Sequence, residues 1–204
     1  MPRLLPFVSS LSVLAGMAAA AEPPTVLLDN DRVRVLRVST TEALAEHPAA
    51  VIVPLEDGVF GKTGAAYWSG ETPASSAQGK TATAIVIEPK DAPPRPLVPA
   101  PPASGPGPGG GVFVGMSFAP LFENGRVAVI RGRMDVGATE GFHTHASDIV
   151  LVHLSGGVIE DTANGQTKVN RWKHGDVELE ARGSSHSARN LGAAVDAVLV
   201  TLKP

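Results

Sequence analysis

A proline- and glycine-rich stretch divides this chain into two halves. Residues 91–111 read DAPPRPLVPAPPASGPGPGGG and contain no periodic apolar pattern. Such a composition cannot bury a core and is typical of a linker. With 204 residues in all, each half is long enough for one small domain. The sequence therefore predicts an N-terminal unit at 22–90 and a C-terminal unit at 112–204, joined by this linker.

The two halves also resemble each other. The segment DNDRVRVLRV (29–38) parallels ENGRVAVIRG (123–132), and each reads as a turn followed by an alternating strand. Near the two ends, TAIVIEPK (83–90) parallels AVLVTLKP (197–204). The spacing between the matched segments is longer in the second half, which indicates a shorter hairpin in the first. A duplicated β-unit is the interpretation that fits both matches.

The residue patterns favour strands throughout. Short β-branched runs are bounded by Gly, Asn, Asp or Ser, and the pair Asn164–Gly165 between two such runs predicts a hairpin. The 22 Gly and 18 Pro residues point to many turns. Only TTEALAEH (40–47) has a helical pattern, and it is short. We therefore expect an all-β protein with two small antiparallel β-barrels.

The first 21 residues have the pattern of a secretory leader. Residues 1–21 contain one Arg, an apolar run and a small-residue end before Glu22. An uncleaved anchor is the alternative, because the apolar run nearly reaches spanning length. We expect a signal peptide, a periplasmic or secreted protein, and no stable membrane insertion after cleavage. The net charge of −3, without a basic cluster, argues against a nucleic-acid partner.

Three of the six histidines fall in two glycine-punctuated blocks. The first block runs Gly137, five residues, His143, one residue, His145. The second contains a glycine followed after two residues by His186. Alternate residues of a strand share a face, so His143 and His145 point the same way. Imidazole is the commonest neutral metal ligand, and three of them are enough for an open site.

At these two blocks the chain resembles the cupin superfamily. Its first motif runs Gly, five residues, His-x-His, three or four residues, Glu, six residues, Gly; its second ends Gly, two residues, His, three residues, Asn. The residues that match are Gly137, His143, His145, Gly156 or Gly157, Gly175, Gly183, His186 and Asn190. The resemblance implies a bicupin, with two jelly-roll (double-stranded β-helix) barrels. It also implies that His143, His145 and His186 are metal ligands.

One departure from the family pattern concerns the fourth ligand. Where the family has Glu, this chain has Ile149 or, at the longer spacing, Val150. Asp148 is adjacent, but a regular strand would turn it away from the Ile149 side. A β-bulge would re-aim it, so Asp148 is a possible fourth ligand.

The first half has lost most of the motif. The residues that align with His143, His145, Ile149 and His186 are Ala45, His47, Val51 and Pro73. A single histidine is more often structural than a ligand, so we expect no metal in this half. Its expected role is to pack against the second barrel and cover apolar strand faces.

The resemblance also implies which ligands, metals and activities to expect. Three neutral imidazoles leave a divalent ion with its full charge, so the site is expected to favour a small anionic organic molecule. Iron is the metal we expect, with manganese, zinc or nickel as alternatives. Some cupin dioxygenases use three histidines without the glutamate, which implies a dioxygenase. A non-catalytic small-molecule or metal-binding cupin and a metal-dependent isomerase or lyase remain alternatives, and a homodimer is possible.

Overall fold

The computed structural model describes residues 23–39, 47–69, 82–96 and 111–204, and all the regular structure in them is β-strand. The strands of the first half are β1 (Thr25–Asp29), β2 (Val33–Val38), β3 (Val51–Pro54), β4 (Tyr67–Trp68) and β5 (Ala84–Pro89). Those of the second half are β6 (Phe113–Glu123), β7 (Val127–Thr144), β8 (Ile149–His153), β9 (Gly157–Ala163), β10 (Gln166–Trp172), β11 (Val177–Glu180), β12 (Ser185–Asn190) and β13 (Val195–Leu202). The predicted all-β, antiparallel fold is confirmed.

The described strands of the first half form one five-stranded sheet in the order β1-β2-β5-β3-β4. All of its neighbouring strands are antiparallel. Val and Ile dominate β2, β3 and β5, and β3 is buried at every position. Such runs suit a sheet that is covered on both faces.

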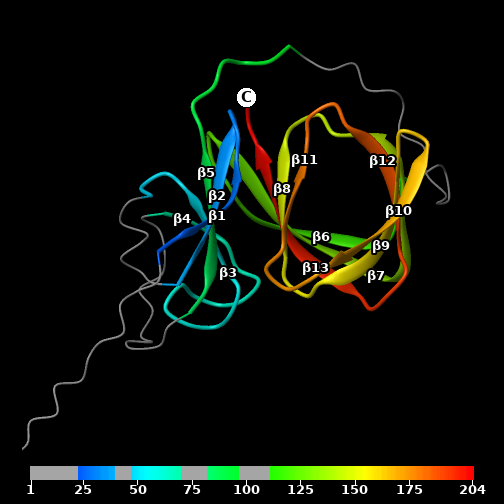
Figure 1. Ribbon diagram of the computed structural model, residues 1–204, viewed down its shortest axis with the longest axis horizontal. Coiled ribbons are helices and arrows are strands. Elements are labelled where there is room, and N and C mark those ends of the chain that lie inside the picture. The colour runs from blue at the N-terminus through cyan, green and yellow to red at the C-terminus, as the bar shows by residue number, and fades with distance from the viewer. Residues whose placement is uncertain (1–22, 40–46, 70–81, 97–110) are drawn as a thin grey trace, which may run out of the picture.

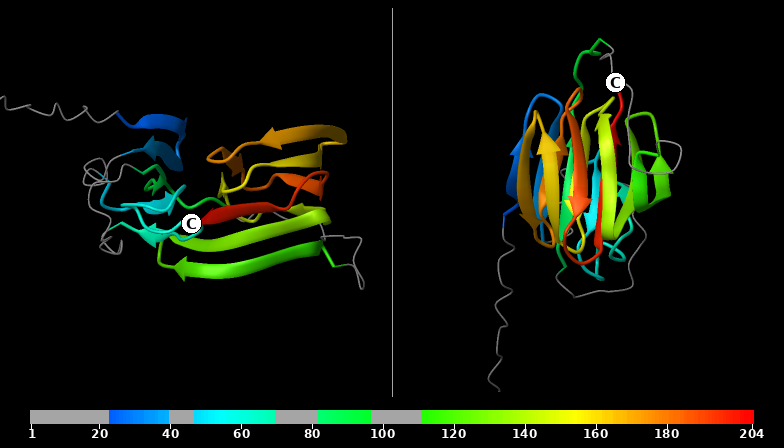
Figure 2. Two further views of the ribbon diagram at one scale, coloured as in Figure 1. Left: turned by 90° about the horizontal axis from the view of Figure 1, so that it is seen from below. Right: turned by 90° about the vertical axis from the view of Figure 1, so that its right-hand side faces the viewer.

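The second half forms an eight-stranded antiparallel sheet that curls into a barrel (Figure 1). Its main path is β10-β9-β12-β7-β13-β8-β11, and β6 pairs with β7. The long strands β6 and β7 run side by side along this unit (Figure 2). The predicted Asn164–Gly165 hairpin joins β9 to β10, and Asn164 has a φ of 52°. Both residues of such a turn need a positive φ, which Asn and Gly adopt most readily.

The strand order agrees with an internal repeat. The order β1-β2-β5-β3-β4 in the first half corresponds to β6-β7-β13-β8-β11 in the second. Residues 55–66, between β3 and β4, form no strand beyond one isolated bridge, whereas the hairpin β9–β10 lies between β8 and β11. The shorter connection in the first half is therefore the missing counterpart of this hairpin.

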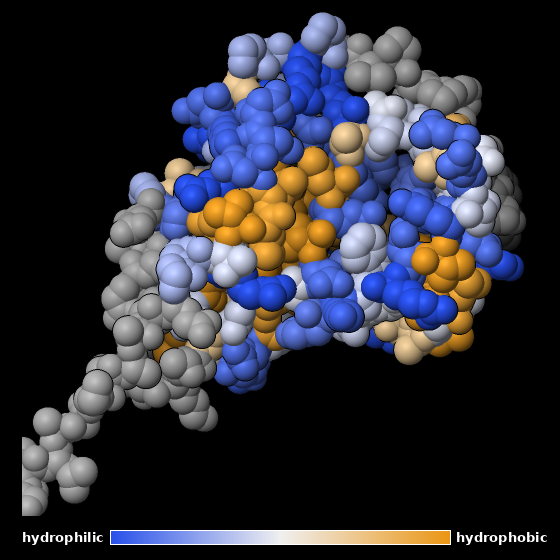
Figure 3. All heavy atoms as spheres, in the orientation of Figure 1, coloured by the Kyte–Doolittle hydropathy of each residue, from blue (hydrophilic) through white to orange (hydrophobic). Residues whose placement is uncertain are grey.

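A shared hydrophobic core joins the two sheets. Equivalent residues of the repeat meet in it, for example Val33 and Val35 from β2 with Val127 and Val129 from β7. Figure 3 shows apolar side chains gathering between β2 and β8 of Figure 1. This packing fits the expected role of the first half, because its sheet covers the outer face of the C-terminal barrel. Burial of these aliphatic side chains contributes about 25 cal/mol for each Å² removed from water.

Strand periodicity gives the C-terminal sheet two apolar faces. On β8, Val150 and Val152 are buried in the shared core, whereas Ile149, Leu151 and His153 line a cavity inside the barrel. Successive side chains of a strand point to opposite faces, so each strand contributes to both. The first half thus closes one face of the sheet, and the other face is free to form a site.

Several predictions fall on residues outside those described. They concern the leader at 1–21, most of the segment 40–47 and most of the linker 91–111. The proposed domain boundaries therefore stay predictions. Within the described residues, no helix has the length and apolar character needed to cross a membrane.

Candidate functional site

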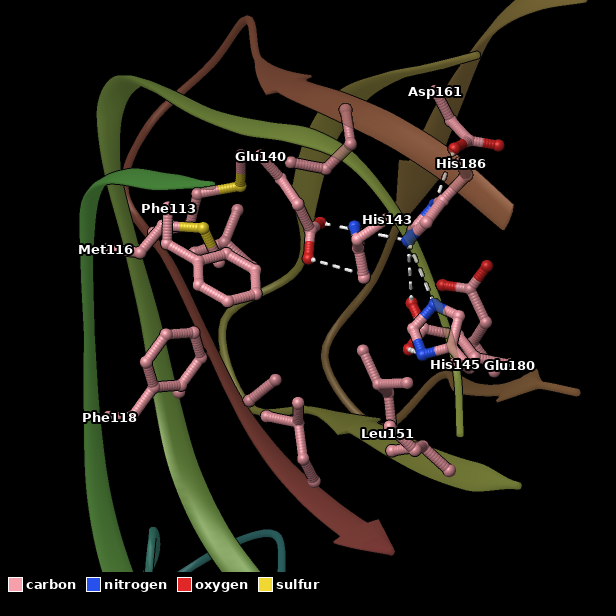
Figure 4. Close-up of a pocket in the computed structure, with 18 of the residues that line it drawn as sticks. Phe113, Met116, Phe118, Glu140, His143, His145, Leu151, Asp161, Glu180 and His186 are labelled. Atoms are coloured by element: carbon pink, nitrogen blue, oxygen red, sulfur yellow. Dashed lines mark hydrogen bonds and ion pairs between the residues drawn. The ribbon is translucent and has the colours of Figure 1, made fainter. Parts of the chain in front are cut away.

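The three motif histidines meet on the inner face of the barrel. His143 on β7 and His186 on β12 are direct partners across the two strands, so their side chains share a face. His145 follows His143 by two residues and shares that face. One nitrogen from each ring lies within 4.8 Å of those of the others. The two motifs therefore build one cluster (Figure 4).

The second motif glycine fixes how the strands meet. Gly183 has a φ of 81°, a conformation that residues with a side chain rarely adopt. Its N–H donates to the carbonyl of His145 at 2.8 Å, and the N–H of His145 donates to the carbonyl of Ser184 at 3.0 Å. This turn holds His145 beside the start of β12.

Two of the rings are anchored through their outer nitrogens. Nδ1 of His143 donates to the carbonyl of Gly141 at 3.0 Å. Nδ1 of His186 donates to Asp161 on β9 at 2.9 Å. Because these bonds place the proton on Nδ1, the lone pair of each ring is on Nε2. Bonds of this kind orient histidines that hold metal ions.

The spacing of the inner nitrogens suits a divalent ion. Nε2 of His145 and Nε2 of His186 lie 3.1 Å apart. Two nitrogens about 2.1 Å from one ion and at right angles to each other would lie about 3 Å apart. Burial and the neighbouring His186 and His143 lower the pKa of His145 to about 4. His145 is therefore neutral at neutral pH, as a metal ligand must be.

A glutamate that the motifs do not mark as a ligand, Glu140, also faces the cluster. Oε1 of Glu140 lies 3.4 Å from Nε2 of His143, and its Oε2 lies 3.9 Å from Nε2 of His186. Glu140 and His143 are three residues apart, so a regular strand would place them on opposite faces. The pairing of β7 with β12 shifts register here, with three residues of β7 spanning two of β12. This bulge turns Glu140 toward the histidines.

A second carboxyl group, Glu180 on β11, also faces the cluster. Its Oε2 lies 3.4 Å from Nδ1 of His145, and its Oε1 lies 3.8 Å from Nε2 of His186. Burial, and then the charge of Glu140 and other carboxylates, raises the pKa of Glu180 to about 8. Burial also raises the pKa of Glu140, although His186 and His143 act in the opposite direction. Carboxyl groups thus surround the imidazoles, in contrast to the expected site without a carboxylate.

The structure places Asp148 away from the histidine cluster. Its Oδ1 accepts a hydrogen bond from the backbone N–H of Arg182 at 2.8 Å. Its Oδ2 lies 3.3 Å from Arg95 and 3.8 Å from Arg32. The strand is regular here, and Ile149, not Asp148, faces the cavity. The fourth-ligand hypothesis for Asp148 therefore lacks the bulge it required.

The aligned residues of the first half have other contacts. Nδ1 of His47 lies 2.5 Å from Oε1 of Glu88, and the histidine is buried. Val51 belongs to the hydrophobic core. Ala45 and Pro73 lie outside the described residues.

The histidine cluster opens onto a cavity of about 430 Å³. This volume is in the ordinary range for small-molecule sites. Met116 and Phe118 of β6 lie on the side of the cavity opposite the histidines, and Phe113 of the same strand packs against His143 (Figure 4). The wall is mainly apolar, with carboxyl groups near the histidines, so the cavity combines an apolar wall with a polar end.

No family model and no curated protein sequence matches the chain. The similar solved structures include a cupin domain from Bordetella pertussis (22% identity, TM-score 0.42, 44% of this chain and 95% of that one). A cupin superfamily protein from Desulfitobacterium hafniense has 17% identity and a TM-score of 0.37 over 44% of this chain and 78% of its own. KdgF from Halomonas sp. has 18% identity and a TM-score of 0.38 over 44% and 80%. These are likenesses of fold.

Three observations from the chain itself agree with the resemblance seen in its motifs. The C-terminal half is a curled antiparallel sheet. Both motifs lie on adjacent strands of that sheet, β7 and β12. Their histidines face its interior. By fold and by motif, the chain resembles the cupin superfamily.

Proposed function

We propose that this protein binds one divalent metal ion through His143, His145 and His186, with Glu140 as a fourth ligand. The observation that carries the proposal is the convergence of the three imidazoles, with two Nδ1 atoms tied to protein acceptors. Glu140 replaces the glutamate that the family supplies from the position of Ile149. Its carboxylate would offset one unit of the ion's charge.

Iron(II) is the metal we propose, with manganese, zinc and nickel as alternatives. Imidazole and carboxylate ligands suit all of these ions. An iron(II) ion with open positions would supply the redox chemistry that lets dioxygen react with an organic molecule. The ligand residues would leave the complex with about one positive charge, which one anionic group of a substrate balances.

We propose dioxygenase activity on a small organic anion. The chain contributes three things: imidazoles anchored by hydrogen bonds, a cavity of about 430 Å³ and a mainly apolar wall. Phe113 packs edge-on against the ring of His143, with centroids 5.6 Å apart, and so restricts the space beside the cluster. These features favour a substrate held beside the ion against an apolar wall.

Oxygen uptake tests this proposal. Protein loaded with iron(II) is incubated with a panel of small carboxylic acids, thiols and phenols in an oxygen-electrode cell. We expect at least one compound to be consumed together with oxygen, and no consumption under argon. Turnover that continues under argon would contradict the dioxygenase and identify an isomerase or lyase. Full metal content without any turnover across the panel would favour the non-catalytic binding protein.

The isomerase or lyase alternative has one observation of its own. Glu180 lies beside His145 and His186, and its raised pKa, about 8, keeps it protonated at neutral pH in the metal-free protein. A protonated carboxyl group next to the substrate position suits general acid–base chemistry.

We also propose that the protein is exported. The support is the pattern of residues 1–21, with a small-residue end before Glu22. N-terminal sequencing of the protein recovered outside the cytoplasm of a bacterial host is expected to begin at Glu22. Recovery of the full-length chain in the membrane fraction would instead identify an anchor.

A further inference from the structure

His153 is a buried histidine that the proposed metal site does not use. It ends β8, its side chain is 4% exposed, and it lines the cavity. Neither ring nitrogen has a hydrogen-bond partner among the described residues. The nearest charged group is Glu178, whose Oε2 lies 3.8 Å from Nε2 of His153. Buried polar groups normally have partners, so one without any points to a ligand.

The ring of His153 packs against a tryptophan. It stacks on the indole of Trp172 with centroids 4.7 Å apart and an angle of 11° between the planes. This contact fixes the plane of the imidazole and leaves its nitrogens at the edge of the ring. A fixed donor and acceptor in a cavity is the arrangement that orients a small molecule.

The pairing of β8 with β11 places His153 and the histidine cluster at different positions along the cavity. Ile149, Leu151 and His153 face the cavity from β8. Glu178 pairs with Leu151, and Glu180 pairs with Ile149. Glu180 contacts the metal cluster and Glu178 contacts His153. Alternate residues of a strand are about 7 Å apart, so the backbone positions of Glu178 and Glu180 on β11 are separated by roughly that distance.

The wall between the two polar ends is apolar. Leu151 of β8 and Phe118 of β6 line the cavity (Figure 4). Ile130 and Leu199 line it as well. A ligand that reaches both ends must therefore have an apolar body. An aromatic ring is an apolar body that can carry polar groups at two opposite ends.

We propose that His153 and Glu178 form a second subsite, which binds a hydroxyl group at the far end of a substrate whose anionic group lies at the metal. This inference rests on the proposed metal site. The hydroxyl oxygen accepts a hydrogen bond from His153, and the hydroxyl proton is donated to Glu178. A second carboxylate would be repelled by Glu178, whereas a hydroxyl group satisfies both side chains. The substrate class is therefore a hydroxylated aromatic carboxylate.

Matched probe pairs test this subsite. The probes are 4-hydroxybenzoate, 4-hydroxyphenylacetate and 3-(4-hydroxyphenyl)propionate, each compared with the analogue that lacks the hydroxyl group. Binding to the metal-loaded protein is measured by isothermal titration calorimetry. We expect at least one hydroxylated probe to bind about tenfold more tightly than its analogue, as one additional buried hydrogen-bonded group allows. The absence of a preference in all three pairs, or of any binding at millimolar concentration, would overturn the subsite.

Two substitutions separate the subsite from the metal site. His153→Phe keeps an aromatic ring against Trp172 and is expected to abolish the preference while metal content stays unchanged. His186→Ala is expected to weaken both members of a pair and to lower metal content. His153→Gln retains a donor and an acceptor, and should keep part of the preference. This second variant distinguishes loss of the hydrogen bonds from misfolding of the His153→Phe protein. A preference that survives both His153 substitutions would reject the subsite, and failure to retain metal in the unmodified protein would reject the proposed function instead.

Discussion

Replacing His186 with alanine is expected to lower the affinity for the metal ion by more than about 100-fold, because loss of a group that only orients a ligand already costs 10–100-fold. His186 has two roles in the cluster. Its Nε2 lies 3.1 Å from that of His145, and its Nδ1 binds Asp161 at 2.9 Å. Metal content after dialysis against a weak chelator, measured by mass spectrometry, checks the result.

A graded series makes this prediction specific. His174→Ala is the matched control, since His174 is exposed and its Nδ1 binds the carbonyl of Leu154. That variant should retain the metal fully. Glu140→Gln should give an intermediate loss, because it removes one charged ligand and leaves the three imidazoles. Equal metal content in the His186 and His174 variants would refute the assignment of the cluster.

The sequence predicted the histidine cluster because strand periodicity decides which residues share a face. His143 and His145 are two residues apart, and the glycine pattern of the second motif places His186 on a neighbouring strand. Glu140 escaped this reasoning, since it is three residues from His143 and a regular strand would turn it away. The bulge that re-aims it depends on how β7 pairs with β12. Such pairing joins distant segments, and no local pattern in the sequence reveals it.

The fold could be predicted for a related reason. Alternating β-branched runs and an Asn–Gly turn are local signals of strands and hairpins. The sequence repeat also matched the segments of β2, β3 and β5 with those of β7, β8 and β13. The alternation on β8 did not reveal that both of its faces are covered. Val150 and Val152 pack on the first half, whereas Ile149 and Leu151 line the cavity. Tertiary packing decides which apolar face of a strand meets the other sheet. The strand propensity of the local sequence carries no information about that choice.

Asp148→Ala is expected to reduce the free energy of unfolding by about 3 kcal/mol, because it leaves a buried arginine without its counter-charge. The side chains of Asp148 and Arg32 are 8% and 10% exposed, and Nε of Arg32 has no hydrogen-bond partner among the described residues. Arg32 precedes β2 in the first half, and Asp148 precedes β8 in the second. Arg95, at the start of the linker, binds the same carboxylate. The loss should therefore weaken the junction of the two halves, as measured by urea denaturation.

Two further variants identify the cause. Asp135→Ala breaks the exposed pair between Arg133 and Asp135 and should cost less than about 1 kcal/mol. Asp148→Asn keeps an acceptor for the backbone N–H of Arg182 but removes the charge, so a loss close to that of alanine would assign the effect to the ion pairs. Metal content should stay unchanged in both Asp148 variants. A fall in metal content without a fall in stability would contradict the junction and make Asp148 a ligand, because only a residue that reaches the ion affects binding without affecting the packing of the two sheets.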